Sequence, residues 1–351
     1  MYHFFIAAAI ASALSLGLTP LMIRLSRRFK ILDLPDKRKT HKTPVPLLGG
    51  VAIYLSAILG TVLYILLFVE GLETNLIVAF IIGISGVAMM GLIDDMLALS
   101  AKRRLVVLFV LAFIVLIGCL QFYFPQDLLH TNLLLTLVIS FIVVFWIVIV
   151  TNAINFSDGL DGLAGCLSLV SSLGFAFIFY LQGRTQLALP TALALCGAIA
   201  GFLPYNINRA RIFMGDAGSM FIGFMLGILS IMSISEKDIV VFIIPVYLMI
   251  VPIMDICMSV LRRLLLRKPV MQPDKMHFHH RLRNRFKNRH AALLILSAAQ
   301  LIFSAVGIVI YIFEFFVFGW FVLIGIGAAG AVYTFFHAKS LRANPQAPEN
   351  K

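Results

Sequence analysis

Two amides and two carboxylates lie close together near the middle of the chain, at Asn152, Asn155, Asp158 and Asp161. Asn155, Asp158 and Asp161 are spaced three apart, which would place them on roughly one face of a helix. Capping of the next helix would account for one such side chain, but not for four. Carboxylate and amide oxygens suit a hard cation, so the segment predicts a metal-competent polar site.

A second pair of acids, Asp94 and Asp95, directly follows an apolar segment. Adjacent carboxylates are costly there, because like charges repel and desolvation disfavours both. The pair could be a solvated helix end. A role in cation binding or acid–base chemistry is favoured, because no polar spacer separates it from the apolar segment. Three basic residues follow at Lys102, Arg103 and Arg104.

A third polar segment, residues 209–219, contains Arg209, Arg211, Phe213 and Asp216 and opens another predicted helix. Free backbone amides at a helix start favour phosphate. Asp216 would repel a phosphate unless a cation lay between them. This conflict favours Mg²⁺, which typically takes one or two protein oxygens together with substrate phosphates.

Two strongly basic loops complete the set. The loop 24–46 includes Lys42 and precedes Gly49 and Gly50. It is either a juxtamembrane loop attracted to anionic lipid or a loop that handles phosphate. The loop 262–290 carries a second basic cluster, at His277, His279, His280, Arg281 and Arg283. Zinc is disfavoured there, since no cysteine lies nearby and the surrounding charge is positive; contacts to a diphosphate are favoured over a solvated loop.

The composition requires a membrane environment. The 351 residues are 61% hydrophobic, with a mean hydropathy of +1.01. About 20 apolar residues cross a bilayer as a helix. By that rule the chain is predicted to be an all-α polytopic membrane protein with eleven spans, at 3–23, 47–69, 75–93, 105–124, 132–151, 161–181, 187–203, 217–235, 239–261, 291–312 and 316–337. Residues 1–337 would form one catalytic domain, and 338–351 a short polar tail.

The basic residues predict the orientation. Of 28 Lys and Arg residues, only Arg184 and Lys237 fall in one of the two alternating sets of connecting segments. Basic loops mark the cytoplasmic side, so the amino terminus is predicted outside and the carboxyl terminus inside. Nucleic acid is then unnecessary to explain the net charge of +12. Kinks are expected at Pro245 and Pro252 of the ninth span, which also contains Asp255.

In this order, the polar segments resemble the polyprenyl-phosphate N-acetylhexosamine-1-phosphate transferases. That superfamily includes MraY-type enzymes of peptidoglycan synthesis and WecA/TagO-type enzymes that start other envelope polymers. The resemblance runs from about residue 33 to residue 283. It rests on the DD motif at 94–95, NAxNxxDGLDGLA at 152–164 and FMGDxGS at 213–219. The histidines at 277–280 resemble the HxHH form of the GlcNAc-1-phosphate branch.

The resemblance implies transfer of GlcNAc-1-phosphate from UDP-GlcNAc to undecaprenyl phosphate, with release of UMP. Asn155 and Asp216 would bind Mg²⁺, for which Mn²⁺ could substitute, and Asp94 or Asp95 would accept the proton of the lipid phosphate. Phe213 would stack on the uracil. The residues implied in catalysis are Asp94, Asp95, Asp158 and Lys102. Those implied in substrate binding are Lys42, Asn152, Asp161, Arg211, Phe213, His277, His279, His280, Arg281 and Arg283.

The implied setting is the bacterial cytoplasmic (inner) membrane, with membrane lipid as a further partner and a homodimer left open. Two other functions compete. A phospho-MurNAc-pentapeptide transferase belongs to the same superfamily. A secondary transporter would gather its ionisable groups near the bilayer midplane, whereas here they gather at one face. A structural membrane protein would have no need of Asp158, Asp161 and Asp216.

Overall fold

A computed structural model describes residues 3–35, 43–123, 133–207, 209–234, 239–269 and 277–343. These residues are almost entirely helical. The first part contains α1 (Phe5–Arg28), β1 (Leu32–Asp33), β2 (Val45–Pro46), α2 (Gly49–Phe68), α3 (Thr74–Leu97), α4 (Ala101–Tyr123) and α6 (Leu133–Ser157). The second contains α7 (Leu163–Leu181), α8 (Ala188–Asn206), α9 (Gly215–Met232), η1 (Ile239–Phe242), α10 (Ile243–Leu248), α11 (Ile250–Leu265), α12 (Phe278–Phe286), α13 (Arg289–Ile312) and α14 (Phe316–Ala343).

The predicted all-α polytopic membrane fold is confirmed. Within the described residues, nine helices are long and apolar enough to cross a membrane: α1, α2, α3, α6, α7, α8, α9, α13 and α14. Helices suit this environment because they satisfy their backbone hydrogen bonds internally, where no water can. The predicted span at 105–124 coincides with α4. The predicted total of eleven is not confirmed.

The predicted ninth span, 239–261, is not one helix. It is divided into η1, α10 and α11, with the interruption at Met249. Pro245 falls in the first turn of α10 and Pro252 in the first turn of α11, where a missing amide costs least. The Gln300 side chain replaces the lost backbone bonds. Its Oε1 accepts from the Val251 amide at 3.2 Å, and its Nε2 donates to the Leu248 carbonyl at 2.6 Å.

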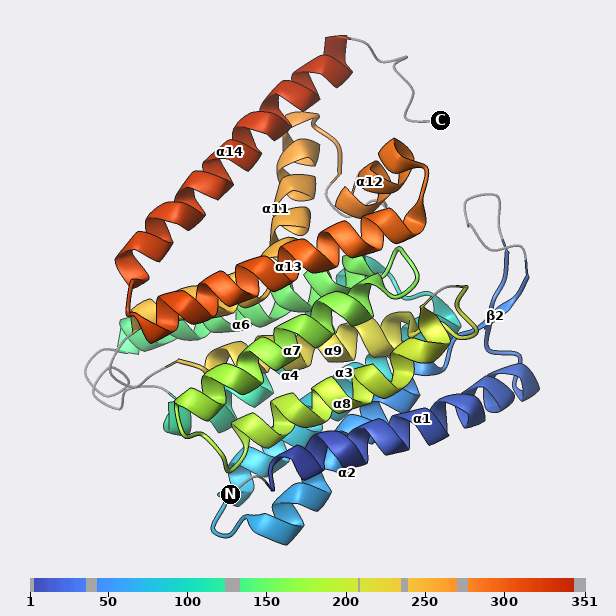
Figure 1. Cartoon of the computed structure of the whole chain (residues 1–351), viewed down its shortest axis with the longest axis vertical. Coiled ribbons are helices and arrows are strands. Elements are labelled where there is room, and N and C mark those ends of the chain that lie inside the picture. The colour runs from blue at the N-terminus through green and yellow to red at the C-terminus, as the bar shows by residue number, and fades with distance from the viewer. Residues whose placement is uncertain are drawn as a thin grey trace.

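Helix α9 lies in the middle of the bundle. Every residue from Ala217 to Met232 is buried, and α6, α3 and α2 pack around it. Figure 1 shows α1, α8, α7 and α13 side by side, with α14 on the outside. The large side chains of α14 are mostly exposed, as expected for a helix that faces lipid. Helix α9 is therefore enclosed by the rest of the bundle from Ala217 onward.

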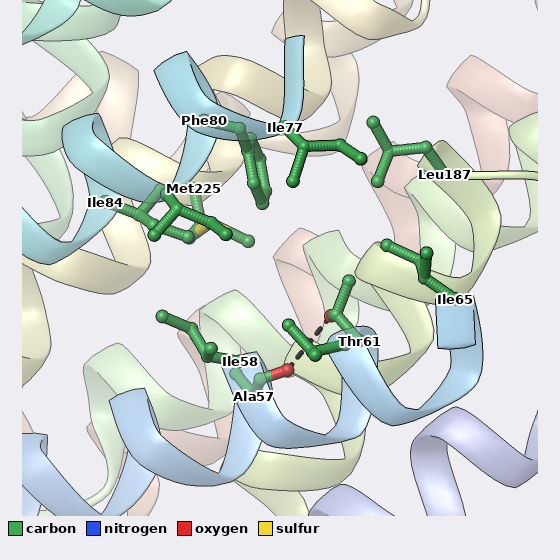
Figure 2. A pocket seen from close by; sticks show the side chains of 11 residues that line it. Ala57, Ile58, Thr61, Ile65, Ile77, Phe80, Ile84, Leu187 and Met225 are labelled. Atoms are coloured by element: carbon green, nitrogen blue, oxygen red, sulfur yellow. Dashed lines mark hydrogen bonds between the residues drawn. The ribbon is translucent and has the colours of Figure 1, made fainter. Parts of the chain in front are cut away.

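The two ends of the bundle differ in chemistry. Strands β1 and β2 pair antiparallel, Leu32 with Pro46 and Asp33 with Val45, and lie with α12 toward the right-hand side of Figure 1. The other end contains a narrow apolar cleft between α2 and α3, shown in Figure 2. Its volume is about 20 Å³, and the Thr61 hydroxyl at its edge donates to the Ala57 carbonyl. The polar segments all belong to the first end.

Candidate active site

The start of α9 is capped by a carboxylate from α3. Asp95 accepts the backbone amides of Asp216 at 2.8 Å and Ala217 at 3.1 Å. Gly91 permits the approach, because a Cβ there would lie 2.5 Å from the Asp216 carbonyl oxygen. The prediction that the amides at this helix start are free for phosphate is wrong for these two. Asp95 already satisfies them, as a capping carboxylate does at a helix N-terminus.

Four side chains converge at this point, and we call them the acid cluster: Asp94, Asp95, Asn155 and Asp216. The Asn155 side chain, from the end of α6, donates from Nδ2 to Asp216 Oδ1 at 2.6 Å and to the Ser219 hydroxyl at 2.9 Å. The structure thus brings the three separate polar segments together. Sequence spacing could not show this, since the segments come from different helices.

Arg104 is the basic residue that reaches the acid cluster. Its Nη1 lies 2.6 Å from Asp94 Oδ2 and 3.3 Å from Asp216 Oδ2. Asp94 is buried and also accepts the Leu99 amide. Lys102, the basic residue chosen from the motif, is exposed and contacts no carboxylate among the described residues. Two carboxylates therefore converge on one positive charge supplied by Arg104.

The acid cluster has the donors that Mg²⁺ prefers. Asp216 offers a carboxylate, and Asn155 would offer Oδ1 if its amide were turned over. The convergence of Asp94 and Asp216 on a guanidinium shows that this position favours positive charge. No group of three His, Cys, Asp or Glu side chains within the described residues is arranged to hold a metal. The fit is thus to a cation that takes two protein ligands and completes its shell with substrate oxygens.

Asp158 and Asn152 have different surroundings although both belong to one motif. Burial, together with the charges of Asp216, Asp95 and Asp161, raises the pKa of the Asp158 carboxyl well above its usual value. No described residue forms a hydrogen bond with that carboxyl. Asn152 instead donates to the Val148 carbonyl of its own helix at 2.8 Å. Asp158 therefore holds a proton more tightly than a solvated carboxyl does, while Asn152 is tied to its own helix.

A cavity of about 650 Å³ is lined by Gly159 and Leu160, which directly follow Asp158. Three residues predicted to contact substrate line it: Asp161, Phe213 and Arg283. Arg209 and Arg289 line it too, and neither was assigned a role from sequence. Asp161 Oδ2 accepts from the Ala210 amide and from Arg289 Nη1, both at 3.3 Å. The cavity combines an aromatic ring, a carboxylate and three arginines, which suits a nucleotide with a diphosphate.

The floor of this region is built by the segment before α2. The Phe213 amide donates to the Pro46 carbonyl at 2.8 Å, and the Gly50 amide donates to the Met214 carbonyl at 2.9 Å. A Cβ on Gly50 would lie 2.0 Å from the Gly218 nitrogen, so only glycine permits this contact. Lys42 lies outside the described residues. Arg211 lines a different hollow, away from Asp161 and Phe213.

The histidines form a second group, which we call the histidine cluster: Asp255, His277, His279 and His280. The Asp255 carboxylate holds His277, with Oδ2 2.9 Å from His277 Nδ1. Asp255 Oδ1 also accepts the Phe278 amide at 2.8 Å and so caps α12. The sequence placed Asp255 near the end of a span but gave no sign of this partnership, because 22 residues separate it from His277.

His279 is buried, with only 3% of its surface exposed. Its ring packs on Gly159, where a Cβ would lie 2.4 Å from Nε2. Burial, with the positive fields of His280, His277 and Arg283, lowers the pKa of His279 to about 2. The ring is therefore neutral at physiological pH and supplies no positive charge to a diphosphate. It joins α12 to the loop that carries Asp158.

The predicted diphosphate set is only partly assembled. Arg283 lines the cavity, but the Arg281 guanidinium donates to the Tyr333 hydroxyl of α14 and lies over its ring, 5.0 Å from the centroid. His280 is half-buried, its ring centroid 4.2 Å from that of His279. One residue of the predicted five thus lines the cavity.

Proteins of similar sequence identify the family of this chain. Residues 77–234 match glycosyl transferase family 4. A probable undecaprenyl-phosphate N-acetylglucosaminyl 1-phosphate transferase of Bacillus subtilis (strain 168) is 34% identical over 310 residues, which cover 87% of this chain and 84% of that protein. The chain belongs to this family. The resemblance inferred from the motifs is confirmed.

Two further relatives represent different branches of the superfamily. A decaprenyl-phosphate N-acetylglucosaminephosphotransferase of Mycobacterium tuberculosis (strain ATCC 25618 / H37Rv) is 33% identical over 297 residues, 74% of this chain and 70% of that protein. A phospho-N-acetylmuramoyl-pentapeptide-transferase of Staphylococcus aureus (strain MW2) is 29% identical over 297 residues, 79% of this chain and 90% of that protein. The matched family region of this transferase contains the acid cluster, Asp161 and Phe213, while the histidine cluster lies beyond it.

Proposed function

We propose that this family 4 transferase moves N-acetylglucosamine 1-phosphate from UDP-GlcNAc to undecaprenyl phosphate, giving undecaprenyl-diphospho-GlcNAc and UMP. The observation that carries the proposal is the 34% identity, over most of both chains, to the Bacillus subtilis protein of that name. The HxHH pattern at 277–280 supports the same branch. The product would be the first lipid-linked unit of an envelope glycopolymer.

The reaction itself is a displacement at phosphorus. An oxygen of the acceptor phosphate would attack the phosphorus that carries the sugar, and the bond from that phosphorus to the bridging oxygen would break, releasing UMP. We assign the acceptor's proton to Asp158, whose carboxyl has a raised pKa and no hydrogen-bonding partner among the described residues. Asp94 and Asp95, the bases first suggested by the motif, are engaged by Arg104 and by backbone amides.

Positioning would come from the cavity and from the acid cluster. Phe213 would stack on the uracil, and Asp161 would contact the nucleoside. Arg209, Arg283 and Arg289 would neutralise the diphosphate, because each lines the same cavity. Mg²⁺ held by Asp216 and Asn155 would neutralise charge on the transferring phosphate. A single displacement needs no covalent enzyme intermediate, and no carboxylate of the acid cluster is left as an isolated nucleophile.

The proposal is tested with purified protein, undecaprenyl phosphate and each of two donors. UDP-GlcNAc should release UMP and form a lipid-linked sugar, whereas UDP-MurNAc-pentapeptide should not. UMP release from the second donor alone would place the protein in the peptidoglycan branch. With the lipid acceptor removed, labelled UMP should not exchange into UDP-GlcNAc, and rapid exchange would favour a covalent intermediate.

We further propose that the acid cluster faces the cytoplasm, with the amino terminus outside. The warrant is the partition of basic residues between alternate connecting segments. After replacement of the four native cysteines, single cysteines at Glu73 and Glu314 should react with an impermeant thiol reagent added to intact cells. Cysteines at Arg28 and Arg285 should not react. The opposite labelling pattern would overturn both the topology and the cytoplasmic placement of the site.

A further inference from the structure

A second hollow lies on the outside of α7 and α8, at the same end of the bundle as the acid cluster. Its volume is about 540 Å³, within the range of small-molecule sites. Its apolar wall comes from Leu169 of α7 and from Ala200 and Leu203 of α8. Arg209 and Arg211, which follow α8 in the chain, line it as well. The hollow, which we call the groove, therefore combines an apolar wall from two membrane spans with two positive charges.

The two arginines are presented from a backbone that is held in place. The Arg211 amide donates to the Tyr205 carbonyl at 2.9 Å, and the Ala210 amide donates to Asp161. The Asn206 side chain donates to the Ile212 carbonyl at 3.0 Å. Both arginines are exposed, and no described residue forms a hydrogen bond or ion pair with either guanidinium. The backbone of residues 210–212 is held by hydrogen bonds, and no described residue occupies either guanidinium.

We propose that this groove binds an anionic phospholipid, with its phosphate on Arg211 and Arg209 and its acyl chains along α7 and α8. The chemistry is complementary in both parts. Guanidinium groups bind phosphate oxygens through paired hydrogen bonds, and the apolar wall, on which Ala200 is exposed, suits acyl chains. Basic pockets between membrane helices on the cytoplasmic side are known to take anionic headgroups.

The occupant is a structural lipid rather than the lipid acceptor of the proposed reaction. The acceptor's phosphate must reach the diphosphate cavity, which Phe213, Asp161 and Arg283 line. Arg211 does not line that cavity. Arg209 lines both, so a phospholipid in the groove would hold this arginine at the cavity wall. The groove would thereby connect the lipid composition of the leaflet to the site.

The test measures lipid binding by the full-length protein and does not depend on the identity of the sugar donor. Native mass spectrometry with phosphatidylglycerol should give tighter binding than with phosphatidylcholine. Arg211→Gln should weaken phosphatidylglycerol binding about fivefold, as expected for one basic residue near an anionic headgroup. Ala200→Trp should fill the groove and weaken binding with both arginines intact. Arg28→Gln, an exposed charge on α1 outside the groove, is the matched control and should leave the affinity unchanged.

A photoactivatable phosphatidylglycerol in nanodiscs should crosslink to peptides that contain Leu169 or Ala200. Equal loss of binding in Arg28→Gln and Arg211→Gln would overturn the proposal, because the effect would be that of surface charge alone. Equal binding of phosphatidylcholine would overturn it as well. Displacement of the crosslink by undecaprenyl phosphate would also overturn it and assign the groove to the acceptor. Arg211 is exposed, so its variant should keep the unfolding temperature of the unmodified protein.

Discussion

The acid cluster and the histidine cluster lie at the same end of the molecule but differ in how their charges are compensated. In the acid cluster two carboxylates, Asp94 and Asp216, share the guanidinium of Arg104, while Asp95 accepts the backbone amides at the start of α9. In the histidine cluster Asp255 is matched by His277 and by the α12 amide, and His279 is neutral and buried. Excess negative charge in the acid cluster can be relieved by a bound cation, whereas the carboxylate of Asp255 already has its partners in His277 and the α12 amide. Among the described residues, the acid cluster thus carries more negative than positive charge, and the histidine cluster is a joint between α11 and α12.

The largest expected effect comes from removing the carboxylate of Asp216. Asp216→Ala should lower kcat at least about 1,000-fold, because the proposed metal loses its charged ligand and Asn155 loses one of its two hydrogen bonds to α9. EDTA should inhibit the unmodified protein, and Mg²⁺ should restore UMP release. Asn155→Ala should be less severe, since an amide contributes less than a carboxylate. Near-normal turnover of Asp216→Ala with an unchanged metal requirement would show that the metal site lies elsewhere.

The next effect distinguishes two neighbouring basic residues. Arg104→Gln should lower kcat/KM about 100-fold, since it leaves Asp94 buried without its ion pair. Lys102→Gln is the matched control, because Lys102 is exposed and reaches no carboxylate in the part of the chain that the structure describes. Its effect should be less than about fivefold, as for a solvated charge. The reverse order in steady-state UMP release would restore Lys102 as the functional residue of the motif.

The Arg104 and Lys102 pair also shows what sequence could predict here. Hydropathy predicted most of the spans, because length and composition alone decide whether a helix can cross a bilayer. The motifs predicted the carboxylates of the acid cluster. The motifs could not distinguish Lys102 from Arg104. The rotation of α4 about its own axis, relative to α3, decides which of the two side chains faces the acid cluster. The break at Met249 depends on Gln300, a contact across 49 residues that periodicity cannot reveal.

Asp255→Asn tests the histidine cluster as a joint. The amide can still accept one hydrogen bond, but it no longer offers a negative charge to His277 or caps α12 as strongly. Thermal unfolding should show a loss of roughly 1–3 kcal/mol, as for a buried charge-assisted hydrogen bond. KM for the donor should rise more than kcat falls, because Arg283 of α12 lines the cavity. A fall in kcat as large as that of Asp216→Ala would mean that the cluster takes part in the reaction itself.

The smallest effect is on the pH dependence of stability, and it depends on His279. Its pKa is about 2 in the folded protein and near 6.5 when unfolded, so the unfolded chain binds the additional proton. Stability from this group is therefore fully present above pH 6.5 and falls by about 1.4 kcal/mol for each unit below it. The groups that face the ring, His280, His277 and Arg283, oppose its protonation and so extend this loss of stability to lower pH without changing its slope.

Unfolding in detergent between pH 7.5 and 5.5 should thus show a smaller loss of stability in His279→Gln than in the unmodified protein. His290→Gln is the matched control, since His290 is exposed at the start of α13, and it should keep the original slope. An unchanged slope in His279→Gln would mean that the ring takes up a proton without leaving Gly159. The histidine cluster would then be able to carry charge, and the contrast between the two clusters would disappear.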